Sequence, residues 1–203
     1  VVPDAPTGLS LAAGSTPSSM INLTWVAPAY TGGTTIIGYR ITENNVVVIN
    51  NTGSSVVTLT RSGLSRGTTY TYKVAALNSA GTGADCTPAS LDTAAEVPDA
   101  PGTLALSAGN PSQNNILLTW STPSDDGGGA ITGYRIKKDG STIVTDTGSS
   151  STTYVATGLT RYTQYNFTVA AINSAGTGAD GNTPSLYTSP DLCAAPTLTA
   201  TAD

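Results

Sequence analysis

GLSRGTTYTYKVAALNSAG, at residues 63–81, returns as GLTRYTQYNFTVAAINSAG at residues 158–176, 95 residues further along the chain. In both copies, apolar and aromatic side chains occupy every second position, which is typical of a β-strand with one buried face. In the first copy the alternating residues are Tyr70, Tyr72, Val74 and Ala76. Each copy runs into the octapeptide NSAGTGAD, residues 78–85 and 173–180, whose glycines indicate a tight turn. We therefore predict the same strand and hairpin in each half of the chain.

The remainder of the chain repeats with the same offset, which indicates two copies of one domain in tandem. The matching stretches are Val2–Pro6 with Val97–Pro101, Leu23–Trp25 with Leu118–Trp120, and Gly38–Ile41 with Gly133–Ile136. We predict one domain over residues 1–93 and a second over residues 94–190. Residues 191–203 begin like a first strand again, so we expect them to start a further repeat or to form a C-terminal tail strand.

Composition favours an all-β protein and excludes several functions. The 203 residues are rich in Gly, Thr and Ser, they include no histidine, and only 10% of them are charged. A net charge of −5 argues against nucleic acid as a partner, and the lack of any long apolar run argues against membrane insertion. Without histidine, the usual general base and most catalytic zinc sites are excluded. Because residue 1 is valine, we expect the chain to be an excised or processed part of a longer protein.

Each repeat resembles a fibronectin type III domain. The resemblance is carried by a Pro-x-x-Pro opening, a tryptophan in the second strand, the Gly-Tyr-Arg-Ile stretch and the long alternating strand quoted above. It implies two tandem seven-stranded immunoglobulin-like β-sandwiches in an elongated array. It further implies that Tyr70 and Tyr165 form tyrosine corners, with each hydroxyl bonded to the backbone before the strand. The core residues expected on this basis are Trp25, Tyr39, Leu64, Tyr70, Trp120, Tyr134, Leu159 and Tyr165.

The octapeptide also resembles part of a nucleotide-binding loop, but such a loop must open a helix. Pro88 and Pro184 follow it instead, so we interpret its glycines as hairpin residues that supply positive φ. Asp125 and Asp126 lie in a glycine-rich loop that offers neither the burial a general acid needs nor enough oxygens for calcium. We expect no catalytic residue, cofactor site or metal site.

In the family that the repeats resemble, the loop between the last two strands lies at the N-terminal end of the domain. The resemblance therefore places the second octapeptide against the linker and the end of the first domain. Since proline restricts the backbone, we expect a junction with a restricted hinge. The junction residues predicted in this way are Pro98, Pro101, Ser174, Gly176 and Gly178.

Two kinds of covalent modification stay open at this point. Cys86 and Cys193 occupy non-equivalent positions and are either two free thiols or the partners of an intermolecular disulfide. The sequons at Asn22, Asn50 and Asn166 are glycosylation sites in a eukaryotic secretory pathway, or chance matches in a chain rich in Asn and Thr.

The function expected from these features is that of a non-catalytic structural spacer and interaction module in an extracellular, cell-surface or virion-surface protein. Its partners would be proteins or neighbouring copies of itself, bound through exposed loops or strand edges. Carbohydrate stays open as a partner, although no motif supports it. The first alternative is a subunit of a fibre or virion that pairs a sheet edge with the C-terminal tail. The second is an accessory module of a secreted carbohydrate-active enzyme.

Overall fold

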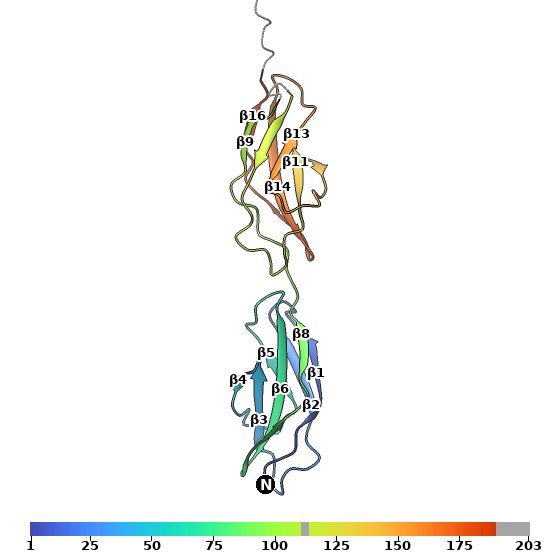
Figure 1. Ribbon diagram of the computed structural model, residues 1–203, viewed down its shortest axis with the longest axis vertical. Coiled ribbons are helices and arrows are strands. Elements are labelled where there is room, and N and C mark those ends of the chain that lie inside the picture. Colours follow the sequence, from blue (N-terminus) through green and yellow to red (C-terminus); the bar gives the residue numbers. More distant parts are fainter. Residues whose placement is uncertain (111–113, 190–203) are drawn as a thin grey trace, which may run out of the picture. The chain divides into compact units, whose positions relative to one another are not determined.

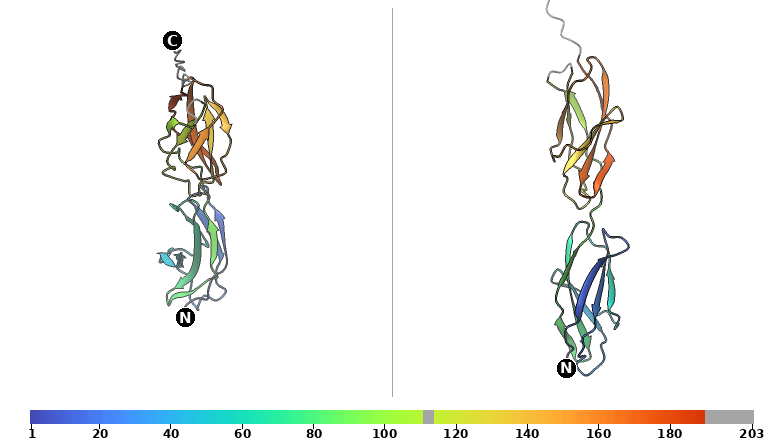
Figure 2. Two further views of the ribbon diagram at one scale, coloured as in Figure 1. Left: turned by 45° about the horizontal axis from the view of Figure 1, so that its top comes forward. Right: turned by 90° about the vertical axis from the view of Figure 1, so that its right-hand side faces the viewer.

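The computed structural model describes residues 1–110 and 114–189, and these residues contain strands and turns but no helix. They form two compact units, the first running from Val1 to Glu96 and the second beginning at Val97. Each unit consists of two antiparallel sheets packed face to face (Figures 1 and 2). The predicted all-β fold of two immunoglobulin-like sandwiches is confirmed. Cys193 and residues 191–203, for which a further strand was predicted, lie outside the described residues.

In the first unit one sheet has the order β1-β2-β5, and the other has the order β4-β3-β6 with β7 and β8 both paired to β6. The strands are β1 (Thr7–Ala13), β2 (Ile21–Val26), β3 (Gly38–Glu43), β4 (Val46–Ile49), β5 (Thr58–Arg61), β6 (Thr69–Asn78), β7 (Gly81–Asp85) and β8 (Ala89–Asp92). The seventh strand of the sandwich is thus divided into β7 and β8. Pro88, which cannot donate a backbone hydrogen bond, lies in the break.

The second unit repeats this topology, with sheets β13-β10-β9 and β12-β11-β14, and with β15 and β16 both paired to β14. Its strands are β9 (Ala105–Ala108), β10 (Ile116–Thr119), β11 (Gly133–Lys138), β12 (Ser141–Val144), β13 (Thr153–Ala156), β14 (Gln164–Asn173), β15 (Gly176–Asp180) and β16 (Ser185–Tyr187). The register repeats as well, because Ile21 faces Arg61 in the first unit and Ile116 faces Ala156 in the second.

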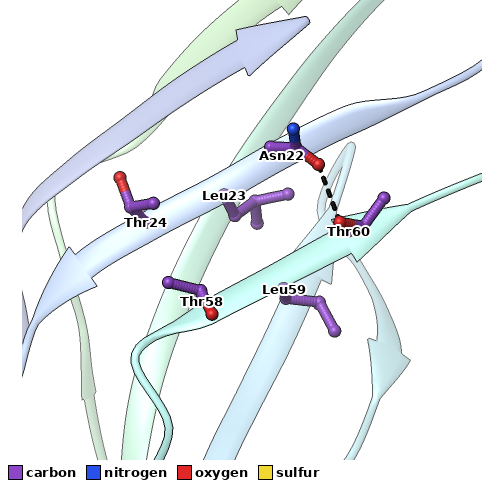
Figure 3. Close-up of a pocket in the computed structure, with 6 residues that line it drawn as sticks. All are labelled: Asn22, Leu23, Thr24, Thr58, Leu59 and Thr60. Atoms are coloured by element: carbon purple, nitrogen blue, oxygen red, sulfur yellow. Dashed lines mark hydrogen bonds between the residues drawn. The ribbon is translucent and has the colours of Figure 1, made fainter. Parts of the chain in front are cut away.

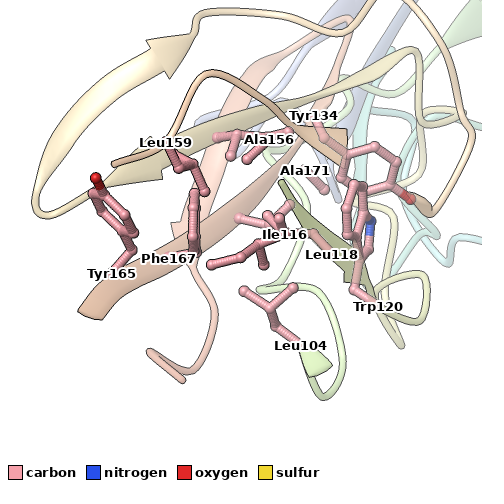
Figure 4. Close-up of a cluster of buried hydrophobic side chains, with 12 residues drawn as sticks. Leu104, Ile116, Leu118, Trp120, Tyr134, Ala156, Leu159, Tyr165, Phe167 and Ala171 are labelled. Atoms are coloured by element: carbon pink, nitrogen blue, oxygen red, sulfur yellow. The ribbon is translucent and has the colours of Figure 1, made fainter. Parts of the chain in front are cut away.

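The alternating side chains of the inner strands form the core between the sheets. In β2, Ile21, Leu23 and Trp25 are buried while Thr24 is exposed. Figure 4 shows the equivalent cluster of the second unit, in which β10 and β14 contribute from opposite sheets. All eight side chains that were expected in the core lie there, each with at most 9% of its surface exposed.

An edge-to-face aromatic pair is part of each core. The rings of Trp25 and Tyr39 have centroids 5.0 Å apart and planes inclined by 70°, and the Trp120 and Tyr134 rings have the same geometry. This arrangement places the positive edge of one ring against the negative face of the other. The identical packing shows that both units use the same solution for the core.

A second shared feature is the tyrosine corner. The backbone N–H of Ser65 donates to the Tyr70 hydroxyl over 2.9 Å, and the N–H of Thr160 donates to the Tyr165 hydroxyl over the same distance. Each bond ties the turn before the long strand to the strand itself. The backbone donor in the turn is thereby satisfied next to the core.

The two units differ in the contacts at one end of the core. In the first unit Glu43 of β3 accepts hydrogen bonds from Arg61 of β5 over 3.0 Å and from the Tyr72 hydroxyl over 2.7 Å. Burial and the bond to Glu43 raise the pKa of Tyr72. The equivalent residues of the second unit are Lys138, Ala156 and Phe167, and there Lys138 lies 4.9 Å from the centre of the Tyr165 ring. A polar link between sheets has been replaced by apolar packing and a cation–π contact.

Ion pairs link the last strand to the third in both units. Arg40 contacts Asp85 over 2.8 Å, and Arg135 contacts Asp180 over 2.8 Å. In the second unit Lys137 adds a contact of 2.6 Å to the same carboxylate. Burial alone would raise the pKa of Asp180, but the hydrogen bonds and charges of Lys137 and Arg135 outweigh it and lower the pKa.

We predict that Asp180→Asn destabilises the second unit at neutral pH and that the difference from wild type shrinks in acid. A carboxylate whose pKa is lowered by folding stabilises the native state above its unfolded pKa, and this contribution is lost as the pH falls through the folded pKa. Urea unfolding of both proteins between pH 7 and pH 2.5 measures the difference. A difference in the free energy of unfolding that stays constant across this range would contradict the prediction.

Candidate interaction surfaces

The octapeptide forms a hairpin in each unit, and in the first unit its asparagine holds this hairpin to the segment that leads into the domain. We call residues 1–6 and 97–101 the leading segments of the two units. Asn78 is 3% exposed; its Oδ1 accepts a bond from the Ala80 N–H, and its Nδ2 donates to the carbonyls of Val1 over 2.7 Å and Thr31 over 2.8 Å. The side chain therefore joins the hairpin, the leading segment and a neighbouring loop.

Asn173 has the corresponding position in the second unit. Its Oδ1 accepts from the N–H groups of Ala175 and Gly176, and its Nδ2 donates to the Asp126 carbonyl over 2.7 Å. A buried amide that uses both its oxygen and its nitrogen in this way is difficult to replace, because any change leaves backbone groups unpaired.

The glycines of the octapeptide have two different roles, and one of them differs from the sequence-based expectation. Gly81 and Gly176 have positive φ, 133° and 139°, as expected for the hairpin. Gly83 and Gly178 do not have positive φ. A Cβ at Gly83 would lie 2.1 Å from the Pro3 carbonyl oxygen, and one at Gly178 would lie 2.1 Å from the Pro98 oxygen. These two glycines are needed for the close approach of the leading segment.

The structure brings most of the predicted junction residues together within the second unit. Pro98 and Pro101 are buried, and Gly178 lies against the Pro98 carbonyl. A Cβ at Gly176 would be 3.4 Å from the side chain of Val97, whereas Ser174 is exposed at the tip of the hairpin. The second octapeptide thus packs on the segment that links the two units. Its expected contact with the first domain stays a prediction.

The described part of the chain contains no group of three or more Asp, Glu, Cys or His side chains that could hold a metal ion. An open depression lies on the outer face of β2 and β5 (Figure 3). It is lined by Asn22, Leu23, Thr24, Thr58, Leu59 and Thr60, and the Thr60 hydroxyl donates to Asn22 Oδ1 over 2.7 Å. The lining side chains are amide, hydroxyl and aliphatic groups, so this surface can make hydrogen bonds and apolar contacts.

Among residues 1–110 and 114–189, no helix has the length and apolarity that crossing a bilayer requires.

The three sequons differ in their surroundings. Asn50 and Asn166 are exposed, while Asn22 is half-buried and hydrogen-bonded to Thr60. The Asn166 side chain lies on the outer face of β14, and both its Nδ2 and its backbone N–H donate to Asp139 Oδ1, over 3.4 Å and 2.9 Å. Glycosylation at these positions stays a prediction.

Cys86 is a free thiol in the break between β7 and β8, and only 5% of its surface is exposed. Its Sγ accepts a hydrogen bond from the Val74 N–H over 3.2 Å, and its own N–H donates to the Val74 carbonyl. Burial raises the pKa of this thiol. An intermolecular disulfide at Cys86 would require the side chain to leave the core, and its proposed partner Cys193 lies outside the described residues.

We predict that the Cys86 thiol reacts with Ellman's reagent far more slowly in the native protein than in urea, because it is buried and poorly ionised. The Cys193→Ser variant isolates this thiol, and its labelling rate in buffer and in denaturant is the measurement. Equal rates under the two conditions would show that Cys86 is accessible in the native state.

Two exposed surfaces distinguish the units from each other. Edge strand β4 of the first unit carries Val46, Val47 and Val48 with exposed fractions of 64%, 49% and 36%. Within residues 1–110 and 114–189, β3 is the one strand that pairs with it. The equivalent strand β12 begins with Ser141 and Thr142. An unpaired apolar edge can add a strand from a partner.

The second surface is a pair of exposed tyrosines, Tyr162 and Tyr187, in the second unit. Sequence reasoning missed them because neither belongs to an alternating core pattern. A signal was nevertheless present, since the 95-residue offset places them on Gly67 and Asp92, so the repeat itself does not require aromatic residues there.

We predict that Gly178→Ala destabilises the second unit by about 1–3 kcal/mol, the range for overpacking, because the new Cβ would collide with the Pro98 carbonyl. Thr177→Ala, at an exposed neighbouring position, is the matched control and should change stability by less than about 0.5 kcal/mol. Chemical unfolding followed by tryptophan fluorescence gives both values. If the two variants are equally stable, the close approach is not a constraint.

A model of the fibronectin type III domain matches the chain twice, over residues 4–91 and 99–186. Endoglucanase B of Cellulomonas fimi is 34% identical over 192 residues, which cover 90% of this chain and 18% of that protein. The netrin receptor DCC of Mus musculus is 32% identical over 180 residues, covering 85% of this chain and 12% of the receptor. The chain therefore spans less than a fifth of the length of either relative.

Among solved structures, the chicken CNTN1 FN1–FN3 domains have the same fold, with a TM-score of 0.56 and 23% identity. The similarity covers 92% of this chain and 67% of that one. With two sandwiches of one topology, tyrosine corners in both and the two family matches, the chain belongs to the fibronectin type III family.

Proposed function

We propose that the chain is a non-catalytic structural spacer and interaction module of an extracellular or surface protein. The observation that carries this proposal is that each unit has its own complete core and its own leading segment packed closely on its hairpin. Units of this kind can be placed in series without sharing a core. Pro98 and Pro101, both buried, limit the freedom of the segment that joins them.

The partners that fit such a module are proteins or neighbouring copies of the chain. Contact would be made through exposed strand edges and loops. The β4 edge with its three exposed valines is the surface of the first unit best suited to protein contact. The similarity to a netrin receptor supports protein partners in general and names none for this chain.

A second candidate is an accessory module beside a secreted polysaccharide-degrading enzyme. It is favoured by the similarity to endoglucanase B, which extends over 90% of this chain. In this setting the chain would itself contribute spacing or substrate contact, while catalysis would reside elsewhere in the parent protein. The parent sequence distinguishes the two candidates, because a glycoside hydrolase domain in it would favour the accessory role.

The spacer proposal predicts a narrow distribution of distances between the two units. Ser55 and Ser150 are exposed and equivalent positions, so each can carry a spin label through an introduced cysteine in a chain that lacks Cys86 and Cys193. Pulsed electron paramagnetic resonance then measures the distance between the labels.

Insertion of Gly-Gly-Ser between Glu96 and Val97 is the control, and it should broaden the distribution because glycine-rich linkers behave as flexible coils. If the chain without the insertion already has the broad distribution of the inserted variant, the units are connected flexibly and the spacer role fails.

A further inference from the structure

The exposed tyrosines of the second unit form one aromatic surface. Tyr162 lies in the turn before β14, and Tyr187 ends β16. Their exposed fractions are 74% and 59%, and their ring centroids are 6.4 Å apart with planes inclined by 43°. We call these two residues the tyrosine pair. Two contacting rings that are this exposed contribute little to a core, so their presence calls for another explanation.

The first unit shows that the fold does not need this pair. Gly67, at the position of Tyr162, has φ 55°, and Tyr162 itself has φ 52°. Asp92, at the position of Tyr187, accepts a hydrogen bond from Thr69. The backbone conformation at position 162 is therefore one that glycine adopts freely and that is unfavourable for tyrosine. A strained, exposed, bulky residue where the sister repeat has glycine is more consistent with a binding role than with a folding role.

Uncharged polar side chains lie on the same face as Tyr187. In the register of β14 and β16, Gln164 faces Tyr187 and Asn166 faces Ser185. The Gln164 side-chain nitrogen donates to the Ser185 hydroxyl over 3.0 Å. Leu186, between Ser185 and Tyr187, points the other way and packs on the core. The outer face thus combines aromatic rings with amide and hydroxyl groups.

We propose that the tyrosine pair binds neutral β-linked glucan chains. A glucopyranose ring with equatorial hydroxyls has two flat faces of C–H groups, which carry a slight positive charge and match the negative face of an aromatic ring. Amides and hydroxyls beside the rings are suited to hydrogen-bond the sugar hydroxyls at the ring edge. The net charge of −5 disfavours acidic polysaccharides. This inference does not depend on the spacer role.

The test uses the full chain with cellohexaose as a soluble probe and amorphous cellulose as an insoluble one. Titration followed by NMR should show cellohexaose shifting the signals of Tyr162, Tyr187 and Gln164, and the chain should bind to cellulose. The double variant Tyr162→Gly/Tyr187→Ala should weaken cellohexaose binding about tenfold or more. Since Tyr162→Gly restores the residue of the first unit at the same φ, this variant should remain folded, which thermal unfolding checks.

Two matched variants sharpen the test. Tyr187→Phe keeps the ring and should retain binding within about twofold. Tyr30→Ala removes a tyrosine of the first unit that is 51% exposed and should leave binding unchanged. The proposal is overturned if wild type binds neither probe, if the folded double variant binds as well as wild type, or if Tyr30→Ala weakens binding equally. It is also overturned if the double variant changes only the self-association of the chain in sedimentation, because the pair would then be a contact between copies.

Discussion

The close approach of each leading segment to the hairpin of its own domain is the constraint that organises both units. The carbonyls of Pro3 and Pro98 lie where a side chain at Gly83 or Gly178 would begin. Next to this contact, the Asn78 side chain donates to the carbonyl of Val1 in the leading segment. In the second unit, the Asn173 side chain donates to the carbonyl of Asp126 in a neighbouring loop. The first strand is thereby positioned beside the last, so that the two sheets enclose a single core. This contact explains why Gly83 of the octapeptide recurs as Gly178 in the second copy.

Residues outside this contact between leading segment and hairpin differ between the two units. Glu43, Arg61 and Tyr72 form a polar link in the first unit, whereas the second unit has Lys138, Ala156 and Phe167. Both solutions fill the same space between sheets of the same register. The exposed surfaces diverge further, with an apolar edge on β4 in one unit and the tyrosine pair in the other. In such a fold, function is determined by these differing surfaces and not by the core and topology that the two units share.

Most of the fold could be predicted because both signals on which it depends can be read directly from the order of the residues. Alternation identifies the strands, and the 95-residue offset identifies the domains. Two features could not be predicted because they depend on segments brought together only by folding. In the sequence Gly83 resembles a turn glycine, and only the structure shows that Pro3 lies against it. Tyr162 and Tyr187 are far apart in the sequence, and only the structure shows that their rings are in contact.

Hydrogen exchange of the Asp4 amide in an Asn78→Ala variant tests this account most directly. That amide donates to the Tyr30 carbonyl over 3.0 Å within the region that Asn78 holds, and the Asp99 amide makes the equivalent bond to Asp125 in the second unit. The account predicts that exchange at Asp4 becomes about tenfold faster or more through local opening and increases more than exchange in β6, while exchange at Asp99 is unchanged. An unchanged rate at Asp4, or a uniform increase throughout the first unit, would contradict it.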